Sequence, residues 1–425
     1  MIIEIRLSNF FSIKDEVVVD MRAGNIKTQK AQDLQSNIFN YKDEQILKSV
    51  AIYGANASGK SNIIKAINFC VLLVRSSHIH NENTIFNFSP FKFENYFEKP
   101  STFFIRFVIK DIEYEYSFSL TKTEFITEEL YYYPNGRRAK IFTRNEQKGK
   151  TKGEIYSFAS VINRPMDIAE NTSRKTLYIS RASQMDREIP KEIFRFFNHE
   201  IILGDYLGYN YFNLQALKSM LDIHKDTLLK AMQFADSDIV DFKMKSEIIP
   251  RKQFQLKYVP NETVLQQEFR NVEEEQLTFL TFHKSNPQIM FDFMAEESSG
   301  TQTLFFLMLA IIDVIKNNKI LLIDEIENNL HTKIVEYILD LFHAGNSAQI
   351  IYTTHNTNLL NLDKLRKDQI YFVNKKEDGA SDLYSLFDYK DFRDTMDVEK
   401  AYLQGRFDAI PYINDSFENL KSIIE

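Results

Sequence analysis

The chain has 425 residues, of which 44% are hydrophobic and 26% are charged. This composition is that of a folded globular chain with a large core, and it excludes a disordered chain. The formal net charge of -7 at pH 7 means that any contact with nucleic acid needs a local basic patch. A single cysteine excludes an internal disulfide framework and fits a reducing compartment.

The N-terminal sequence MIIEIRLSNFFSIKDEVVVD carries early charges and has no signal-peptide pattern. The apolar run from Leu304 to Ile312 is shorter than the ~18–20 residues that span a membrane. We therefore expect a cytoplasmic protein without a membrane segment.

The first half of the chain is predicted to consist mostly of strands. Alternating apolar residues rich in Ile, Val, Phe and Tyr occur in MIIEIRLSNF, EVVVDM, SVAIYG, STFFIRFVIK and IEYEYSFSLT. One predicted helix, SNIIKAINFCVLLVRSS, interrupts them. From about Pro190 to Phe234 the apolar spacing becomes helical, and short strands are expected to return near QFQLKYV and LTFLTFHK.

The last part of the chain alternates between helix and strand, in LFFLMLAIIDVI, KILLIDE, TKIVEYILDLFHA and AQIIYTTH. Such alternation predicts a mostly parallel sheet covered by helices. We therefore expect an α/β core closed by both ends of the chain, with the middle inserted. The expected parts are an N-terminal lobe over residues 1–180, a mainly helical insertion over 181–285 and a C-terminal lobe over 286–425.

A phosphate-binding loop is predicted in AIYGANASGKS, where a strand precedes the loop and a helix follows it. The glycines allow backbone N–H groups to surround a phosphate, and the helix N-terminus adds positive charge. Lys60 is expected to reach the β- and γ-phosphates of a nucleotide, and Ser61 to bind Mg²⁺. The predicted nucleotide-binding residues are Gly54, Ala55, Asn56, Ala57, Ser58, Gly59, Lys60 and Ser61.

Two carboxylates follow the predicted buried strand of KILLIDEIENNLH. Strands of open α/β sheets present their carboxyl ends to the ligand. We expect Asp324 to hold Mg²⁺ and Glu325 to orient or deprotonate the attacking water.

His355 ends the next strand, in AQIIYTTHNTNLL, about thirty residues after the acidic pair. One amphipathic helix lies between, a spacing that fits a right-handed crossover with the two strand ends side by side. His355 is thus a candidate for contact with the γ-phosphate or the attacking water.

Together, the phosphate loop, ESSGTQ, LLIDE and TTH resemble the head domain of ABC-type ATPases, most closely the SMC, RecF and OLD branch. More narrowly, SPFKFENYFEKPSTFFIRFVI and AYLQGRFDAIP resemble bacterial abortive-infection ATPases of the AbiL/RloA type. The resemblance implies an ABC-type P-loop NTPase head of α/β class. Such a head is expected to have a mixed β lobe, a mostly parallel sheet with flanking helices, and an inserted helical region.

The stretch EESSGTQTLFFLMLAII predicts a helix start that Ser298 or Ser299 caps. In the family, the loop at this place reads LSGGQ or LSGGE and contacts ATP held by a second subunit. Ser298 takes the serine position and Gly300 a glycine position, whereas Glu297, Ser299 and Thr301 depart from the pattern. The segment ENNLH takes the place of the loop that crosses the dimer interface, and no glutamine is assigned to the family's Gln-loop.

The function implied is that of an ATPase that uses ATP and Mg²⁺ as a head-to-head homodimer or higher oligomer. Its nucleotide state would be read by a partner effector, in bacterial anti-phage defence of the abortive-infection kind. A RecF-like DNA-repair or DNA-binding ATPase is the alternative. About seventy residues follow His355 and no D-x-D occurs among them. We therefore expect no nuclease site in this chain, and a Toprim-type nuclease as a separate partner.

The segment Asn135 to Gly153 is the strongest basic cluster of the chain. It is either a solvated hairpin or a surface for nucleic acid or an acidic partner. The residues proposed for nucleic acid are Arg137, Arg138, Lys140 and Arg144.

Overall fold

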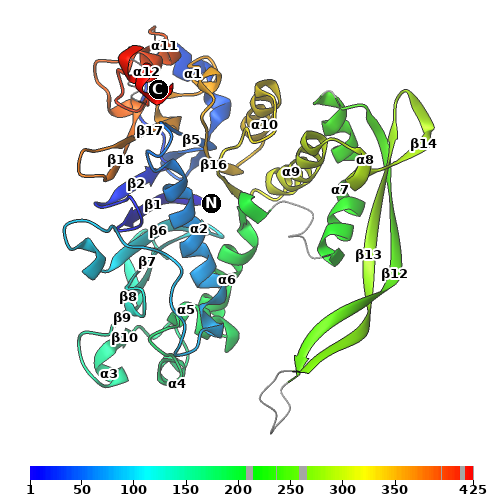
Figure 1. The fold of residues 1–425 in the computed structure, drawn as a ribbon. Coiled ribbons are helices and arrows are strands. Elements are labelled where there is room, and N and C mark those ends of the chain that lie inside the picture. The colour runs from blue at the N-terminus through cyan, green and yellow to red at the C-terminus, as the bar shows by residue number, and fades with distance from the viewer. Residues whose placement is uncertain (207–213, 236, 258–265, 394, 412–416, 425) are drawn as a thin grey trace. The chain divides into compact units, whose positions relative to one another are not determined.

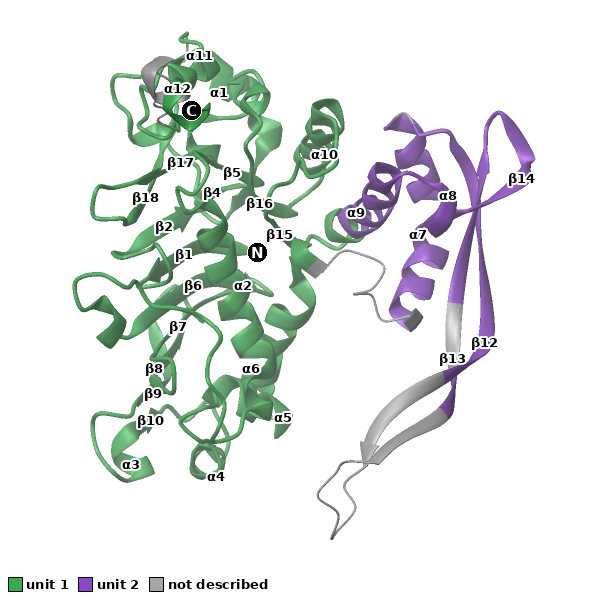
Figure 2. Cartoon of the chain, in the orientation of Figure 1, with its two compact units in different colours: residues 1–205, 313–425 green, residues 206–312 purple. Residues whose placement is uncertain are grey.

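The computed structural model describes residues 1–206, 214–235, 237–257, 266–393, 395–411 and 417–424. The chain forms two compact units, one from residues 1–205 and 313–425 and the other from 206–312 (Figure 2). Both ends of the chain thus contribute to the first unit and the middle forms the second, the arrangement that we expected.

The first unit contains an antiparallel sheet of seven strands (Figure 1). They are β1 (Ile2–Ser8), β2 (Val17–Asp20), β6 (Ser101–Ile109), β7 (Ile112–Leu120), β8 (Phe125–Tyr132), β9 (Ala139–Asn145) and β10 (Tyr156–Phe158). Their order in the sheet is β10-β9-β8-β7-β6-β1-β2. The alternation read in the sequence follows from this arrangement, because Phe103, Ile105 and Phe107 of β6 all face the core.

A second sheet of the same unit has six strands, and most of its pairs are parallel. They are β5 (Ser49–Gly54), β11 (Ile201–Leu203), β15 (Ile320–Ile323), β16 (Gln349–Thr353), β17 (Ile370–Lys375) and β18 (Ser381–Ser385). The order is β11-β15-β16-β5-β17-β18. Every residue of β5 and β16 is buried, which explains why both strands read as continuous apolar runs.

The helix α2 (Lys60–Ser76) connects the two sheets. It contacts β1 of the antiparallel sheet and β5, β15 and β16 of the parallel sheet. Its residues Ile63, Ile67 and Val71 belong to one hydrophobic core that includes residues of both sheets. This single core fixes the strand and the helix on either side of the predicted phosphate loop.

Shorter elements complete the first unit. They are α1 (Gln29–Asp33), β3 (Ile38–Tyr41), β4 (Glu44–Leu47), α3 (Lys152–Ile155), α4 (Pro165–Glu170), α5 (Tyr178–Gln184), α6 (Glu188–Arg195), α10 (Thr332–Ala344), α11 (Val398–Leu403) and α12 (Phe417–Ile424). As predicted, α10 is the helix between the parallel neighbours β15 and β16.

The second unit consists of α7 (Leu214–Phe234), the antiparallel strands β12 (Ile239–Lys257), β13 (Gln266–His283) and β14 (Asn286–Asp292), the short helix α8 (Phe293–Glu296) and the start of α9 (Ser299–Lys316). An aromatic cluster holds it together, in which the rings of Phe242, Phe279, Phe293, Phe305 and Phe306 contact one another.

The expectation of a mainly helical insertion over 181–285 is wrong for its second half. The helix α7 is present, but β12 and β13 form a long hairpin where only two short strands were expected. The reason lies in the alternation of Phe242 and Met244 with Asp241, Lys243 and Lys245, a strand pattern that extends the pairing well before QFQLKYV.

The helix α9 is long and apolar enough to cross a membrane, judged by length and composition alone. Within the protein 56% of it is buried, as in the core helix of a soluble protein, and one such helix is weak evidence for a membrane span. The absence of a membrane segment stays a prediction.

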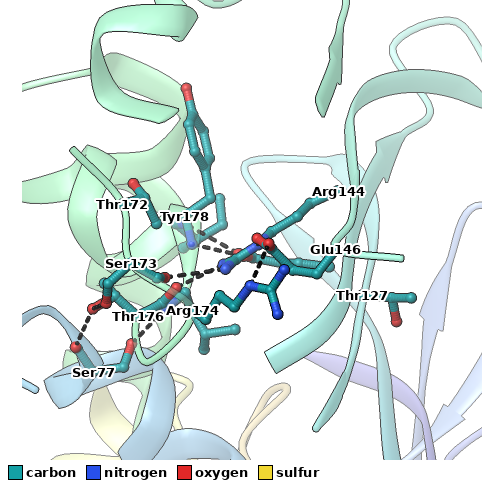
Figure 3. A network of polar contacts seen from close by, with 12 residues as sticks. Ser77, Thr127, Arg144, Glu146, Thr172, Ser173, Arg174, Thr176 and Tyr178 are labelled. Atoms are coloured by element: carbon teal, nitrogen blue, oxygen red, sulfur yellow. Dashed lines mark hydrogen bonds and ion pairs between the residues drawn. The ribbon is translucent and has the colours of Figure 1, made fainter. Parts of the chain in front are cut away.

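A buried charge network joins β8 and β9 to the chain that leads into α5 (Figure 3). The Arg144 side chain is fully buried and donates to Glu146, at 2.8 Å, and to the carbonyls of Ser173 and Thr176. Glu128 is also buried, lies 3.6 Å from Arg144, and accepts the N–H groups of Tyr178 and Ile179 at the start of α5. Burial raises the pKa of Glu128, and Arg144 opposes this rise.

Replacing Arg144 with Met is expected to lower the free energy of unfolding by about 3–5 kcal/mol, because Glu128 and Glu146 lose their buried cation. Denaturant unfolding followed by circular dichroism measures the loss. The matched control is Arg138→Met, since Arg138 is 49% exposed in its pair with Glu115 and its removal is expected to cost no more than about 1 kcal/mol. Equal losses in the two variants would contradict a structural role for the network.

Candidate functional site

The predicted phosphate loop lies between the end of β5 at Gly54 and the start of α2 at Lys60. Its backbone takes left-handed conformations at Ala57 (φ 62°) and at Gly59 (φ 109°). A strand, a tight loop and a helix N-terminus therefore follow one another, as the sequence predicted. This geometry turns backbone N–H groups and the positive end of the α2 dipole toward one small volume.

The two glycines of the loop permit close contact with neighbouring segments. A Cβ on Gly59 would lie 2.0 Å from the Ser381 hydroxyl and 2.6 Å from the Ser12 hydroxyl. A Cβ on Gly54 would lie 2.5 Å from the carbonyl oxygen of Val373. Both positions thus need glycine for packing, in addition to the access to phosphate that the sequence suggested.

Lys60 is buried, and its amine donates to the carbonyls of Gly54 at 2.7 Å and Ala55 at 2.9 Å. Burial lowers the pKa of this amine from 10.5 to about 8, although Asp324, Glu325 and Glu327 oppose the change. The lysine therefore lies inside the curve of the loop, close to the carboxylates that follow β15.

The acidic pair follows β15, and Thr353 at the end of β16 holds both members. The Thr353 hydroxyl donates to the Asp324 carboxylate and accepts the backbone N–H of Glu325 at 2.8 Å. Glu325 itself has a left-handed backbone, with φ 52°. The turn after β15 is therefore fixed from the neighbouring strand.

His355 lies next to Glu325, because the strands β15 and β16 that precede them are parallel neighbours. Its Nε2 is 3.2 Å from a Glu325 oxygen, and its backbone N–H donates to Glu327. Both members of the pair are partly exposed, His355 at 37% and Glu325 at 49%. The predicted side-by-side placement of the two strand ends is thus present in the structure.

A pocket of about 560 Å³ brings these residues together. It is lined by Ser12, Ala55, Asn56, Ala57, Gly59, Lys60, Ser61, Asn62, Glu325, His355 and Lys375. Gly54 and Ser58 belong to the same loop, and Asp324 is close enough for its charge to raise the pKa of Lys60. The pocket therefore joins a phosphate loop to a carboxylate and a histidine, the groups that phosphoryl transfer to water requires.

A family model described as "AAA domain, putative AbiEii toxin, Type IV TA system" matches residues 49–361, which include the loop, the acidic pair and His355. The chain belongs to this family. The prediction of an ABC-type ATPase head related to the Abi-type AAA proteins is therefore confirmed, as is its α/β P-loop fold. No curated protein matches the chain.

Among solved structures, the chain is similar to SMC head domains, including the following three. The SMC head domain from Thermotoga maritima has a TM-score of 0.40 and 13% identity, over 90% of this chain and 98% of that one. An SmcHead bound to the C-winged helix domain of ScpA has a TM-score of 0.37 and 18% identity, over 95% and 99%. A Pyrococcus furiosus Smc head with an extended coiled coil, bound to the C-terminal domain of ScpA, has a TM-score of 0.36 and 16% identity, over 100% of this chain and 99% of that one.

The predicted signature residues lie in the second unit of this AAA protein, at the start of α9. Ser298 is exposed, and its hydroxyl accepts the backbone N–H of Thr301 at 3.1 Å, so Ser298 is the residue that caps the helix. Glu297, in the family's leucine position, is bound instead by Thr281 at 2.6 Å and His283 at 2.7 Å. Gly300 falls in the first turn of the helix.

The expectation that Arg144 could contact nucleic acid is wrong. The side chain is fully buried in the network of Figure 3. Its partner Glu146 lies two residues along the same segment, but the sequence could not reveal the burial because Glu128 and the accepting carbonyls of Ser173 and Thr176 come from other segments. Arg138 is held by Glu115 and stacks over Tyr131, and Lys140 donates to Ser157. The remaining basic patch is therefore smaller than predicted, and two of its side chains, Arg138 and Lys140, already have partners within the protein.

Three contacts of the site were missed in the sequence. Thr353 fixes the acidic pair, Glu327 binds the backbone of His355, and Asp205 after β11 has a pKa raised by burial and by the charge of Asp324. A hydroxyl two residues before His355 and a third acid in DEIE were visible signals for the first two. Asp205 had no local signal, because only the pairing of β11 with β15 brings it near.

We expect ATP binding by this protein to weaken as the pH rises through about 8, because the Lys60 amine then loses its proton. The sign follows from linkage: an anionic ligand binds the protonated amine, so affinity falls up to about tenfold per pH unit above that pKa. Titration calorimetry with ATP between pH 7.5 and 9.5 measures the slope. The control is Lys60→Arg, whose guanidinium stays charged; an equal decline in that variant would rule out Lys60 as the cause.

Proposed function

We propose that this protein binds ATP with Mg²⁺ and hydrolyses it to ADP and phosphate. The observation that carries the proposal is the shared pocket of the phosphate loop, Glu325 and His355. In this proposal residues 54–61 hold the phosphates, and Lys60 moves from the carbonyls of its own loop to the β- and γ-phosphates.

The residues present fit a nucleotide and its metal ion. The Ser58 hydroxyl is buried without a hydrogen-bond partner among the described residues, in a loop with two glycines. The Ser61 hydroxyl and the Asp324 carboxylate supply the hard oxygen ligands that Mg²⁺ prefers. When bound, Mg²⁺ would neutralise charge on the β- and γ-phosphates.

Glu325 and His355 then divide the work at the γ-phosphate. Glu325 orients the attacking water and accepts its proton, while His355 donates a hydrogen bond to the γ-phosphate or to that water. Thr353 and Glu327 act as positioning residues, since one fixes the Glu325 backbone and the other the His355 backbone.

We further propose that the site is completed by a second copy of the chain. Half-exposed Glu325 and His355 are open to water, and charges exposed to water stabilise a transition state poorly. In the ABC-type arrangement, Ser298 and Gly300 of one subunit contact the γ-phosphate bound by the other. The exposure of Ser298 at the N-terminus of α9 fits that use.

The assembly would report the nucleotide state to a separately encoded effector, for which a Toprim-type nuclease is one candidate. The family description, which refers to a toxin and to a type IV toxin–antitoxin system, supports a role in bacterial anti-phage defence. Contact with nucleic acid, if it occurs through the basic cluster, would use the exposed Arg137 together with Arg138 and Lys140.

Replacing Glu325 with Gln is expected to lower the hydrolysis rate at least 100-fold while ATP still binds, because the amide cannot accept the proton. Phosphate release and size-exclusion chromatography with ATP measure the rate and the accumulating dimer or larger oligomer. Glu336→Gln, on α10 and not among the residues that line the pocket, is the control and is expected to hydrolyse normally. Hydrolysis at the unmodified rate by Glu325→Gln would exclude Glu325 as the catalytic carboxylate.

Mixing Lys60→Ala with Ser298→Arg subunits tests for sites shared between chains. Each variant alone is expected to be inactive, but a mixed dimer contains one site with an intact phosphate loop and an intact signature. Activity of the mixture should therefore recover toward about half of the unmodified level per mixed dimer, as half of its sites are complete. No recovery at any mixing ratio would argue against action in trans.

A further inference from the structure

The far side of the pocket carries a cation that the proposed hydrolysis does not use. Lys375 lines the pocket at the end of β17, and its side chain is exposed. Its amine has no hydrogen-bond or ion-pair partner among the residues that the structure describes. The next residue, Lys376, instead forms an ion pair with Asp382 at 3.1 Å. Lys375 is thus an exposed positive charge that lines the pocket and is available for a ligand.

The sheet order places Lys375 opposite the hydrolytic pair. The strand β5, which leads into the phosphate loop, has β16 and β15 on one side and β17 on the other. Glu325 and His355 follow β15 and β16, so they define one end of the pocket. Three strand spacings of ~4.8 Å separate β17 from β15, ~14 Å in all, which places Lys375 at the other end.

The backbone that carries Lys375 is fixed against the phosphate loop. In the register of β17 and β5, Val373 lies opposite Gly54, so Lys375 follows two residues beyond the point where the loop begins. The Ser381 hydroxyl, on the paired strand β18, donates to the Ser58 carbonyl at 2.5 Å and lies within hydrogen-bond distance of the Ser12 hydroxyl, at 2.7 Å. The strand end is therefore positioned, while the lysine amine remains free to reach a ligand.

We infer that Lys375 binds the α-phosphate of the bound nucleotide, an inference that rests on the proposed function. A triphosphate whose γ-phosphate lies by Glu325 and His355 must extend its α-phosphate and ribose across the loop, toward β17. In the proposed site Lys60 binds the β- and γ-phosphates. A second ammonium group at the β17 end can therefore reach only the α-phosphate. Because ADP keeps that phosphate, Lys375 would contribute equally to ATP and ADP binding.

The inference predicts that Lys375→Ala weakens the binding of both ATP and ADP by about 5- to 20-fold, the range of a partly exposed charge-assisted hydrogen bond. Titration calorimetry with each nucleotide at fixed Mg²⁺ measures the loss, and Lys375→Arg is expected to restore most of the affinity. The matched control is Lys376→Ala, whose amine is occupied by Asp382 and which does not line the pocket. Thermal unfolding verifies that all variants are folded.

The outcomes separate this inference from the proposed function. If the unmodified protein binds ATP and Lys60→Ala does not, the proposed nucleotide site stands. Unchanged affinity of Lys375→Ala would then overturn the role of Lys375 alone. A loss for ATP but not for ADP would place Lys375 at the γ-phosphate and overturn the α-phosphate assignment. If the unmodified protein binds neither nucleotide, both the proposed function and the inference fall.

Discussion

The whole arrangement depends on β5 being enclosed by two strands from the other end of the chain. All six residues of β5 are buried, and its parallel neighbours β16 and β17 begin at Gln349 and Ile370. The phosphate loop leaves the sheet at Gly54, in close contact with the backbone of Val373. The loop therefore cannot take its shape until residues more than 290 positions apart have paired, and this distant pairing carries a large entropy cost. Nucleotide binding in this protein is consequently a property of the folded first unit and not of the motif alone.

Polar side chains secure that enclosure where apolar packing cannot specify register. The buried Gln349 amide binds both backbone groups of Ile2, accepting its N–H at 2.7 Å and donating to its carbonyl at 2.9 Å, and so connects the parallel sheet to the antiparallel one. Near the phosphate loop, the hydroxyls of Ser12 and Ser381 are joined at 2.7 Å, next to a Gly59 that leaves no room for a side chain. A buried polar group that loses its partner costs more than the hydrogen bond is worth, so these pairs penalise alternative alignments of the two sheets. Of these residues, Ser12 and Gly59 also line the pocket to which Lys375 belongs.

The sequence was most informative at positions where a polar or charged residue directly follows a buried strand. The phosphate loop, the acidic pair and His355 were all predicted, because short apolar runs followed by charged residues indicate the edge of a parallel sheet. Contacts made across strands were not predictable, since Thr353 acts on an acidic pair that precedes it by nearly thirty residues. The burial of Arg144 was missed for the same reason, because a run of basic residues looks solvated until its partners are known. The β12–β13 hairpin is longer than its sequence pattern suggests, because the helical spacing of α7 ends only a few residues before the strand alternation begins.

The exposure of Glu325 and His355, the pair proposed to hydrolyse ATP, sets the remaining physical problem. A histidine and a glutamate 3.2 Å apart, with 37% and 49% of their side chains exposed, interact through water as much as with each other. At the dielectric constant of water, the interaction energy of two unit charges at about 4 Å is only ~1 kcal/mol. Partial exclusion of water raises this interaction energy several-fold. Preorganised groups therefore gain most of their catalytic value when a surface covers them. A helix N-terminus with an exposed hydroxyl, such as Ser298 at the start of α9, has the polarity needed to cover a γ-phosphate. In the proposed mechanism, closure by a second copy of the chain is thus the step that would convert this arrangement from a binding site into a hydrolytic one.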